Sequence, residues 1–325
     1  MAMDRAYMQT TGLLPPAPIQ SWLALSTPPS PTCNGLDGSV RYRPVSDDER
    51  AAVAAIKVAI AGIYDPVKHN DAMLLRFAVG MQLDVERATA ALEKAIAWKN
   101  RNAVDRMWHG PLTDGEAAFS RYHVQMWHGV DHDGHPVFFD RIGRSDRKQF
   151  FRAVTDVDVS FWYARAQEVG LVLAQDVTSA TGRHVDSLTF VFDLDGMGVT
   201  DAANPNVVAM FQTAVSLMQN VYVGSLHRLL IINAPVVFSG VWRVLVNFID
   251  AQAQKKMEVL GSRWRQRLLE IVPASSLPRY LQGSCRHCPG DECIALPARA
   301  PTPEPEKRAV SSPTPSDLDG TIGLL

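Results

Sequence analysis

Cysteine is scarce in this sequence, and so are the segments that would direct a chain into or across a membrane. Only four cysteines occur among 325 residues, and Cys33 stands alone, which fits a reducing compartment better than a disulfide framework. No apolar run approaches the roughly 18 residues expected of a membrane-spanning helix. The N-terminal stretch also lacks a basic segment followed by an apolar core, so a secretory signal is disfavoured. We therefore expect a cytoplasmic protein.

An excess of charge and recognisable catalytic motifs are missing as well. The 32 Lys plus Arg and 34 Asp plus Glu leave a net charge of −2, so no basic field points to nucleic acid. Neither a P-loop nor a G-x-S-x-G motif is present. Residues 195–198 (DGMG) follow a predicted strand, but Asp201 stands where a dinucleotide fingerprint needs its third glycine, which favours a plain turn. We expect no enzyme, no catalytic residue and no cofactor.

Histidines gather in one short region of the chain. Four of the nine lie at His123, His128, His132 and His135, within a predicted β-hairpin. A metal site there is one interpretation. However, His132 and His135 flank the turn, and the sequence shows no residue paired with them that would hold a metal-bound imidazole by a hydrogen bond. The sequence therefore favours a solvated hairpin.

The C-terminal cysteines resemble part of a zinc site. Cys285, Cys288 and Cys293 lie close together, with His287 between the first two. Because no second C-x-x-C follows, the pattern is incomplete. We predict no metal site, although the sequence leaves open whether these thiols bind one.

Proline marks the two ends of the chain. Fourteen of the 21 prolines fall in residues 1–45 and 286–325, where periodic apolar patterning is absent. We predict a disordered Pro-rich extension over 1–45 and a flexible Cys/Pro-rich tail over 286–325. The folded part is then divided into a helical unit over 46–110 and a second domain over 115–285.

The folded part begins with helices and continues with alternating strands and helices. A capping box, Ser46-x-x-Glu49, precedes the first helix. We predict helices over 46–62, 71–81, 84–99, 148–181, 206–222 and 262–271, a hairpin over 122–142, and strands at 187–193, 226–232 and 257–260. Alternation of strands with helices of this length predicts a mainly parallel sheet in an α/β fold.

The segment from 237 to 249 is the least ordinary of these elements. It is apolar on nearly every face, unlike a surface helix. At about 20 Å long it is too short to cross a bilayer. It therefore lies in a large core, covers a cavity for an apolar ligand, or contacts a membrane surface.

Six motifs, in order, resemble the CRAL-TRIO lipid-binding family, which includes the cellular retinaldehyde-binding protein and the yeast-type phosphatidylinositol/phosphatidylcholine transfer proteins. The resemblance covers about residues 46–293. The motifs are LLRF (74–77) with LDV (83–85), DHDGHPVFFDRIG (131–143), FDLDG (192–196), LIINAP (230–235), VLGS (259–262), and LP (277–278) with GSC (283–285).

This resemblance implies a helical N-terminal unit followed by a CRAL-TRIO lipid-binding domain, in which a sheet floor and an apolar gate helix enclose a cavity. Leu188, Phe190 and Phe192 alternate onto one strand face, and we expect Phe190 to face the ligand. Trp242 is expected to enter the membrane interface when the gate opens. The expected lipid-binding residues are Trp127, Phe138, Leu188, Phe190, Phe192, Phe238, Val241, Trp242, Leu245, Val246, Ile249 and Lys256.

The family's headgroup positions are largely changed. An Arg-Lys pair of the phosphatidylinositol binders corresponds to Met81-Gln82, a glutamate to Gly224 and a threonine to Ala253, whereas Lys256 matches the family's lysine. The hydroxyl-bearing phosphatidylcholine positions fall at Trp127, Phe138, Leu188 and Phe190. Because an unpaired buried polar group costs roughly 1–3 kcal/mol, we expect a ligand less polar than a phosphoinositide.

The resemblance thus implies a protein that binds a hydrophobic lipid and transfers or presents it between membranes. Its partners would be the lipid and, transiently, a membrane surface, so that the cytoplasmic protein is peripheral to membranes at times. An alternative is a sensor or scaffold that responds to ligand occupancy without bulk transfer. The sequence identifies no protein partner.

Overall fold

The structure is a computed structural model and describes residues 45–105, 111–198, 201, 204–236, 238–261, 263–286, 288 and 293. The predicted Pro-rich extension up to residue 44, Cys33, His287 and the tail beyond 293 lie outside the described residues. Among the described residues, no helix combines the length and the apolar character needed to cross a membrane.

A five-stranded sheet with the order β1-β2-β3-β4-β5 forms the centre of the fold. β1 pairs antiparallel with β2, and all later neighbours pair in parallel. The predicted α/β fold with a mainly parallel sheet is confirmed. The strands are β1 (Gln125–Val130), β2 (Pro136–Asp140), β3 (Leu188–Asp193), β4 (Leu226–Ile232) and β5 (Met257–Val259).

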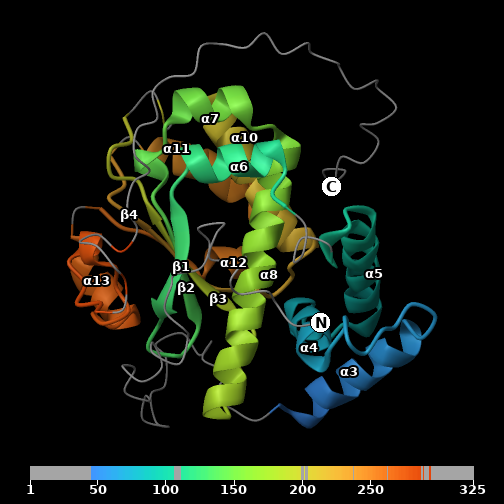
Figure 1. Cartoon of the computed structure of the whole chain (residues 1–325). Helices are drawn as coiled ribbons and strands as arrows, with labels where there is room; N and C mark the ends of the chain where they lie inside the picture. The colour runs from blue at the N-terminus through green and yellow to red at the C-terminus, as the bar shows by residue number, and fades with distance from the viewer. Residues whose placement is uncertain are drawn as a thin grey trace, which may run out of the picture.

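Three capped helices form the N-terminal part of the described residues. They are α3 (Asp47–Ala59), α4 (Asp71–Gly80) and α5 (Val85–Arg101). Ser46 and Glu49 form the predicted capping box, while Asn70 and Asp84 cap the next two helices through their side-chain oxygens. Each cap accepts a hydrogen bond from a backbone N–H that the helix itself leaves without a partner. In Figure 1 these helices form a group on the far side of α8 from the sheet.

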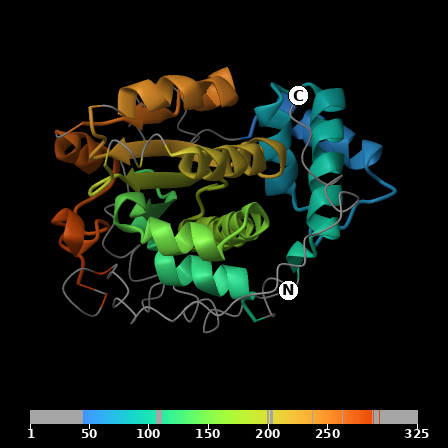
Figure 2. The ribbon, with the colours of Figure 1, turned by 90° about the horizontal axis from the view of Figure 1, so that it is seen from above.

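Helices cover both faces of the sheet, as Figure 1 shows for α8 on one side and α13 on the other. The longer helices are α6 (Asp114–Tyr122), α7 (Arg147–Ala153), α8 (Asp156–Thr181), α10 (Pro205–Asn220), α11 (Phe238–Leu245) and α13 (Trp264–Ile271). Short elements are η2 (Ile142–Arg144), η3 (Val246–Phe248), α12 (Ala251–Gln254) and η4 (Arg279–Leu281). Seen from above, α11 lies beside α10 (Figure 2).

Strand alternation divides the core into two clusters. Phe190 belongs to the cluster on the α8 face, whereas the next residue, Val191, belongs to the cluster on the α13 face. Gly170 of α8 lies against the Trp127 ring so closely that a Cβ there would be 2.3 Å from Trp127 Cζ2. The absence of a side chain at this position lets α8 approach the sheet floor.

The hairpin turn is held by Asp131. Its Oδ1 accepts hydrogen bonds from the backbone N–H groups of Asp133 and His135, at 2.9 and 2.8 Å, and its Oδ2 accepts one from Thr189 Oγ1 at 2.6 Å. The carboxylate therefore shapes the turn and ties it to β3.

The expectation of a solvated hairpin is wrong for most of its histidines. His123, His128 and His135 are buried, and only His132 of the four is exposed. The reason is tertiary contact: His128 lies against Ser276, His135 stacks on the His227 ring, and His123 contacts Asp140.

Candidate functional site

An apolar cavity lies between the sheet, α10 and α11. None of the described residues that line it carries a charge. From the strands and nearby loops come Phe192, Leu194, Met197 and Ile231; from η2 and α8, Ile142 and Tyr163; from α10, Val207, Val208, Met210, Phe211 and Ala214; and from α11, Phe238, Val241 and Leu245.

The cavity is small, and its lining is apolar. Its volume is about 40 Å³, whereas ligand pockets commonly measure about 300–1,000 Å³. Tyr163 brings a phenol, whose oxygen lies 3.3 Å from Asp140 Oδ2. Burial, together with the nearby Asp140, holds the pKa of Tyr163 well above its usual value, so this group stays neutral and donates to Asp140. A lipid chain is much larger than this space.

The inner side of α11 is apolar, whereas its outer side carries Ser239, Gly240 and Arg243 together with Val244. Phe238 and Leu245 are buried, while Val244 is 55% and Phe248 39% exposed. The helix is shorter than predicted: it ends at Leu245 and continues as the 3-10 turn η3 to Phe248. Of the three alternatives for this segment, the structure excludes complete burial in a core, because part of its apolar surface faces outward.

Trp242 lies at the side of α11 rather than on its outer surface. It is half-buried, and its ring is 6.2 Å from the Phe238 ring and 6.3 Å from the Phe211 ring, measured between centroids. The ring thus joins α11 to α10. The outward apolar positions beside it are Val244 and Phe248.

Two glutamine side chains hold the C-terminal end of this segment. Gln219 of α10 donates from Nε2 to Phe248 O at 3.0 Å and accepts from Asp250 N at 2.7 Å. Gln254 of α12 donates from Nε2 to Val246 O at 3.1 Å and to Ile249 O at 2.8 Å. We call these four bonds the glutamine clasp. They hold η3 and the residues that follow it in place after α11 has ended.

Asn233 forms the other end of the segment, where β4 stops. Its backbone is left-handed, with φ of 55°, a conformation that asparagine tolerates better than most residues. Its Nδ2 donates to Asp193 Oδ1 at 2.8 Å, and its Oδ1 accepts from Trp264 Nε1 at 2.6 Å. One side chain therefore links the ends of β3 and β4 to α13 at the entry to α11.

We expect Asn233→Ala to lower the free energy of unfolding by more than Asn233→Gly. Both variants lose the two hydrogen bonds, worth about 1–3 kcal/mol together. Alanine adds about 1–2 kcal/mol because its Cβ strains the left-handed backbone, which glycine adopts freely. Urea unfolding of the two variants measures the difference. Equal losses would show that the backbone conformation contributes nothing here.

The structure brings together only some of the residues expected to bind lipid. Phe192, Phe238, Val241 and Leu245 line the apolar cavity. Val246, which is half-buried, and Ile249, which is buried, have their carbonyls in the glutamine clasp.

The other strand residues lie deeper. Trp127, Phe138 and Leu188 are fully buried beneath α8, where Trp127 Nε1 donates to Ala166 O at 3.1 Å. Phe190 is buried among the Trp127, Phe138 and Phe192 rings and does not border the cavity. Within β3, the cavity is thus bordered by Phe192 rather than Phe190.

Neither the cavity-lining side of α10 nor Met197 was predicted from the sequence. Val207, Phe211 and Ala214 follow helical spacing, which indicates an apolar helix face. That signal was available, but it does not distinguish a face packed in a core from one that borders a cavity.

The positions aligned with the family's headgroup residues lie mostly in apolar surroundings. Met81 and Ala253 pack against the main core cluster. At Gly224, a Cβ would lie 2.8 Å from Arg76 O. Lys256 donates from Nζ to Leu226 O at 2.7 Å, so its ammonium binds the start of β4.

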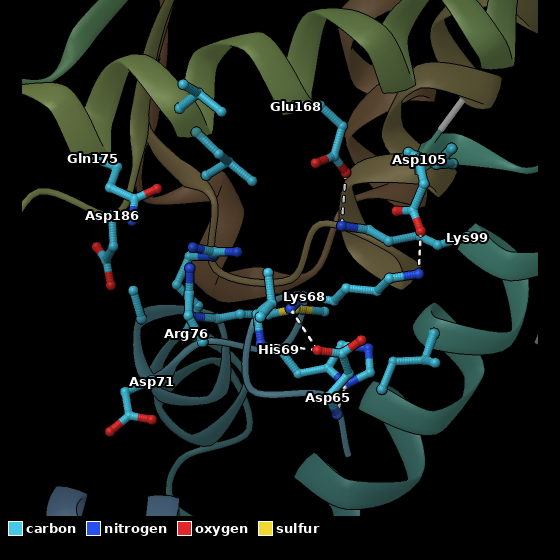
Figure 3. A pocket seen from close by; sticks show the side chains of 18 of the residues that line it. Asp65, Lys68, His69, Asp71, Arg76, Lys99, Asp105, Glu168, Gln175 and Asp186 are labelled. Carbon is cyan, nitrogen blue, oxygen red and sulfur yellow. Dashed lines mark hydrogen bonds and ion pairs between the residues drawn. The ribbon is translucent and has the colours of Figure 1, made fainter. Parts of the chain in front are cut away.

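A second, polar cavity of about 1040 Å³ lies between the N-terminal helices and α8 (Figure 3). Lys99 of α5 reaches Glu168 of α8 at 2.7 Å, and its Nζ lies 4.8 Å from the centre of the Tyr222 ring. Tyr222 also donates to Glu168 Oε1 at 2.8 Å. These contacts connect the N-terminal helices to α8.

Burial lowers the pKa of two basic groups in this polar cavity, Arg76 and His69. It lowers the pKa of the Arg76 guanidinium, against the attraction of Asp186 and Glu168. It also lowers the pKa of His69, whose Nδ1 accepts a hydrogen bond from Asp65 N at 3.0 Å. Accepting this bond requires an unprotonated Nδ1, in agreement with a neutral ring.

Comparison with known proteins identifies relatives over most of the described residues. The chain is 28% identical over 252 residues to the phosphatidylinositol/phosphatidylcholine transfer protein SFH11 of Arabidopsis thaliana, covering 77% of this chain and 67% of that one. It is 26% identical over 247 residues to the Sec14 cytosolic factor of Schizosaccharomyces pombe, covering 76% and 85%. It spans 46% of a further Arabidopsis relative, SFH7, at 27% identity.

A solved structure and a family profile agree with these similarities. The crystal structure of Sfh5 superimposes with a TM-score of 0.56 at 17% identity, covering 69% of this chain and 83% of that one, which supports the fold. Residues 120–283, about half of the chain, match the profile of the CRAL/TRIO domain. The chain therefore belongs to the CRAL/TRIO family.

Proposed function

We propose that this protein binds a hydrophobic lipid beneath α11 and carries it between membranes. The observation that carries the proposal is the apolar cavity, whose described lining has no charged residue and whose cover, α11, turns an apolar side toward it and exposes Val244 on the outside. The names of the relatives SFH11 and Sec14 cytosolic factor, together with family membership, support lipid binding and transfer at the family level. No residue is assigned a bond-making role.

The ligand is less polar than a phosphoinositide in this proposal. A phosphoinositol headgroup needs cations and hydroxyls, since burying its polar groups without partners costs roughly 1–3 kcal/mol each. Here Met81 and Ala253 pack in apolar surroundings, and of the matched positions only Lys256, which donates to Leu226 O, carries a charge. A sterol, an isoprenoid or a tocopherol-like molecule fits these surroundings better.

The larger polar cavity is less suited to hydrocarbon. Its rim carries Lys68, Lys99, Asp105 and Glu168, which pair with one another across the cavity. An acyl or sterol chain placed there would contact apolar residues such as Met73, Ile96 and Leu171, but it would also separate these ions from water. We therefore place the lipid beneath α11, where the smaller cavity must widen by movement of that helix.

We expect phosphatidylinositol transfer by the pure protein to be near background, while a weakly polar lipid is transferred. Donor and acceptor phosphatidylcholine vesicles, carrying either labelled phosphatidylinositol or a labelled sterol, measure this preference. Mass spectrometry of lipids extracted from the purified chain identifies the natural cargo. Robust phosphatidylinositol transfer would contradict the proposed polarity, and absence of any extracted or transferred lipid would contradict the proposed function. Tight binding without transfer would favour an occupancy sensor or scaffold instead.

A further inference from the structure

Four potential metal ligands from distant parts of the chain meet on the α13 face of the sheet. His128 belongs to the edge strand β1, and Cys285, Cys288 and Cys293 follow η4 near the C-terminal end of the described residues. Their ligand atoms, one ring nitrogen and three sulfurs, all lie within 4.8 Å of one another. We propose that these four side chains form a tetrahedral structural Zn²⁺ site.

The dimensions of the cluster suit this ion. Zinc bonds of about 2.3 Å to sulfur and about 2.0–2.1 Å to nitrogen place tetrahedral ligand atoms roughly 3.5–3.8 Å apart. The observed atoms need only small side-chain rotations to reach those separations. Cys285 and Cys288 also have the C-x-x-C spacing that lets two thiolates of one turn bind the same zinc.

The His128 ring is oriented by its second nitrogen. Nδ1 lies 2.9 Å from Ser276 O, and because a carbonyl can only accept, Nδ1 carries the proton. Nε2 then has the lone pair that a metal requires, which is the arrangement usual for zinc-bound histidines. Gly129 permits this close contact: its φ is +71°, and a Cβ there would lie 2.8 Å from Ser276 O.

Arg279 arranges the cysteine segment. Its Nη1 donates to Cys285 O at 2.7 Å and its Nη2 donates to Cys288 O at 2.8 Å. Its backbone N–H donates to Cys293 Sγ at 3.3 Å. Zinc bound by three thiolates and a neutral imidazole carries a net negative charge, which a guanidinium and an N–H···S bond stabilise. Arg279 therefore holds the backbone at Cys285 and Cys288 and contacts the sulfur of Cys293.

The donor set and its burial favour zinc in a structural role. Three thiolates and one imidazole suit Zn²⁺, and four protein ligands leave no position for a substrate. His128 is 1%, Cys285 3% and Cys288 7% exposed, so a bound ion would be shielded from solvent. The site would join the C-terminal segment to the edge strand, on the face opposite the apolar cavity.

The full-length chain, purified without added chelator, tests the site through its metal content. We expect one zinc per chain in the wild type and in Cys33→Ser, which changes the one cysteine outside the cluster. His128→Asn and Cys288→Ser should lose more than roughly a hundredfold in zinc affinity. Even replacing a residue that only hydrogen-bonds to a metal ligand costs about 10–100-fold. His132→Asn, a change of an exposed histidine in the same hairpin, should retain zinc.

Cobalt(II) provides a second readout that does not depend on the variants folding. Replacement of zinc by cobalt in the wild-type chain should give the intense visible bands of tetrahedral coordination and a thiolate charge-transfer band. Removal of the metal should lower the melting temperature, and zinc should restore it. A wild-type chain without zinc that gives no such cobalt spectrum would overturn the proposal. So would an octahedral spectrum, bound iron with sulfide, or unchanged zinc in folded Cys288→Ser.

Discussion

Replacing Val244 and Phe248 together by aspartate is expected to weaken vesicle binding by roughly ten- to a hundredfold, with lipid transfer falling in parallel. Both side chains point outward from the cavity cover and are 55% and 39% exposed. Moving two such partly exposed side chains into hydrocarbon is worth about 1.5–3 kcal/mol in total, and a carboxylate does not enter hydrocarbon. Vesicle co-sedimentation and a transfer assay measure the two effects.

The same variant should remain folded, because exposed substitutions usually change stability by only about 0.5 kcal/mol. Val58→Asp is the matched control: Val58 is 77% exposed but lies on α3, far from α11 in sequence. It should leave vesicle binding and transfer unchanged. A folded double variant with wild-type vesicle binding would show that the outer side of α11 does not meet the membrane.

Phe190→Ala is expected to lower the free energy of unfolding by about 3–5 kcal/mol, the usual cost of removing a packed aromatic ring. The Phe190 ring lies 5.9 Å from the Trp127 ring and 5.8 Å from the Phe138 ring, between centroids. Phe192→Ala on the same strand face should cost less, about 1–3 kcal/mol, since one side of Phe192 borders the cavity and already lacks packing partners. Urea unfolding gives both values.

Lipid separates these two variants further. Saturating ligand should stabilise Phe190→Ala about as much as the wild type, whereas Phe192→Ala should gain less because a cavity contact has been removed. If the two variants lost equal stability and responded equally to ligand, Phe192 would be an ordinary core residue and the cavity would not extend to β3.

The sequence was sufficient to predict the boundaries of an element where a cap or turn residue lies next to it. Strand β4 begins and ends where the sequence predicts it, because an apolar run is followed by Asn233-Ala234-Pro235. The capping residues Ser46 and Asp84 likewise mark helix starts that the structure shows. In each case the physical cause, a cap or a turn residue, is adjacent to the element that it limits.

Contacts between distant segments explain what the sequence could not predict. The apolar pattern of α11 continues past Leu245, but the α-helix ends there and hydrogen bonds from Gln219 and Gln254 hold the turn that follows. His128 shows no signal of its own, because its partners Ser276 and the cysteines come from the opposite end of the folded unit. The neighbouring His287 was the obvious fourth ligand by spacing alone, and it lies outside the described residues.

The apolar inner side of α11 bears on how well cargo would be retained in water. Swinging α11 outward in water would expose Phe238 and Leu245, which are now buried, at a cost of about 3–6 kcal/mol. Breaking the glutamine clasp adds to this cost mainly through its two part-buried bonds, because water can replace the two exposed ones. An opening that costs about 4 kcal/mol occurs in only about one molecule in a thousand. If α11 opened against a bilayer, the same side chains would enter hydrocarbon instead of water. Most of the free-energy cost of opening would then disappear. Leakage into the aqueous phase would then be rare, and release would be confined to encounters with a membrane.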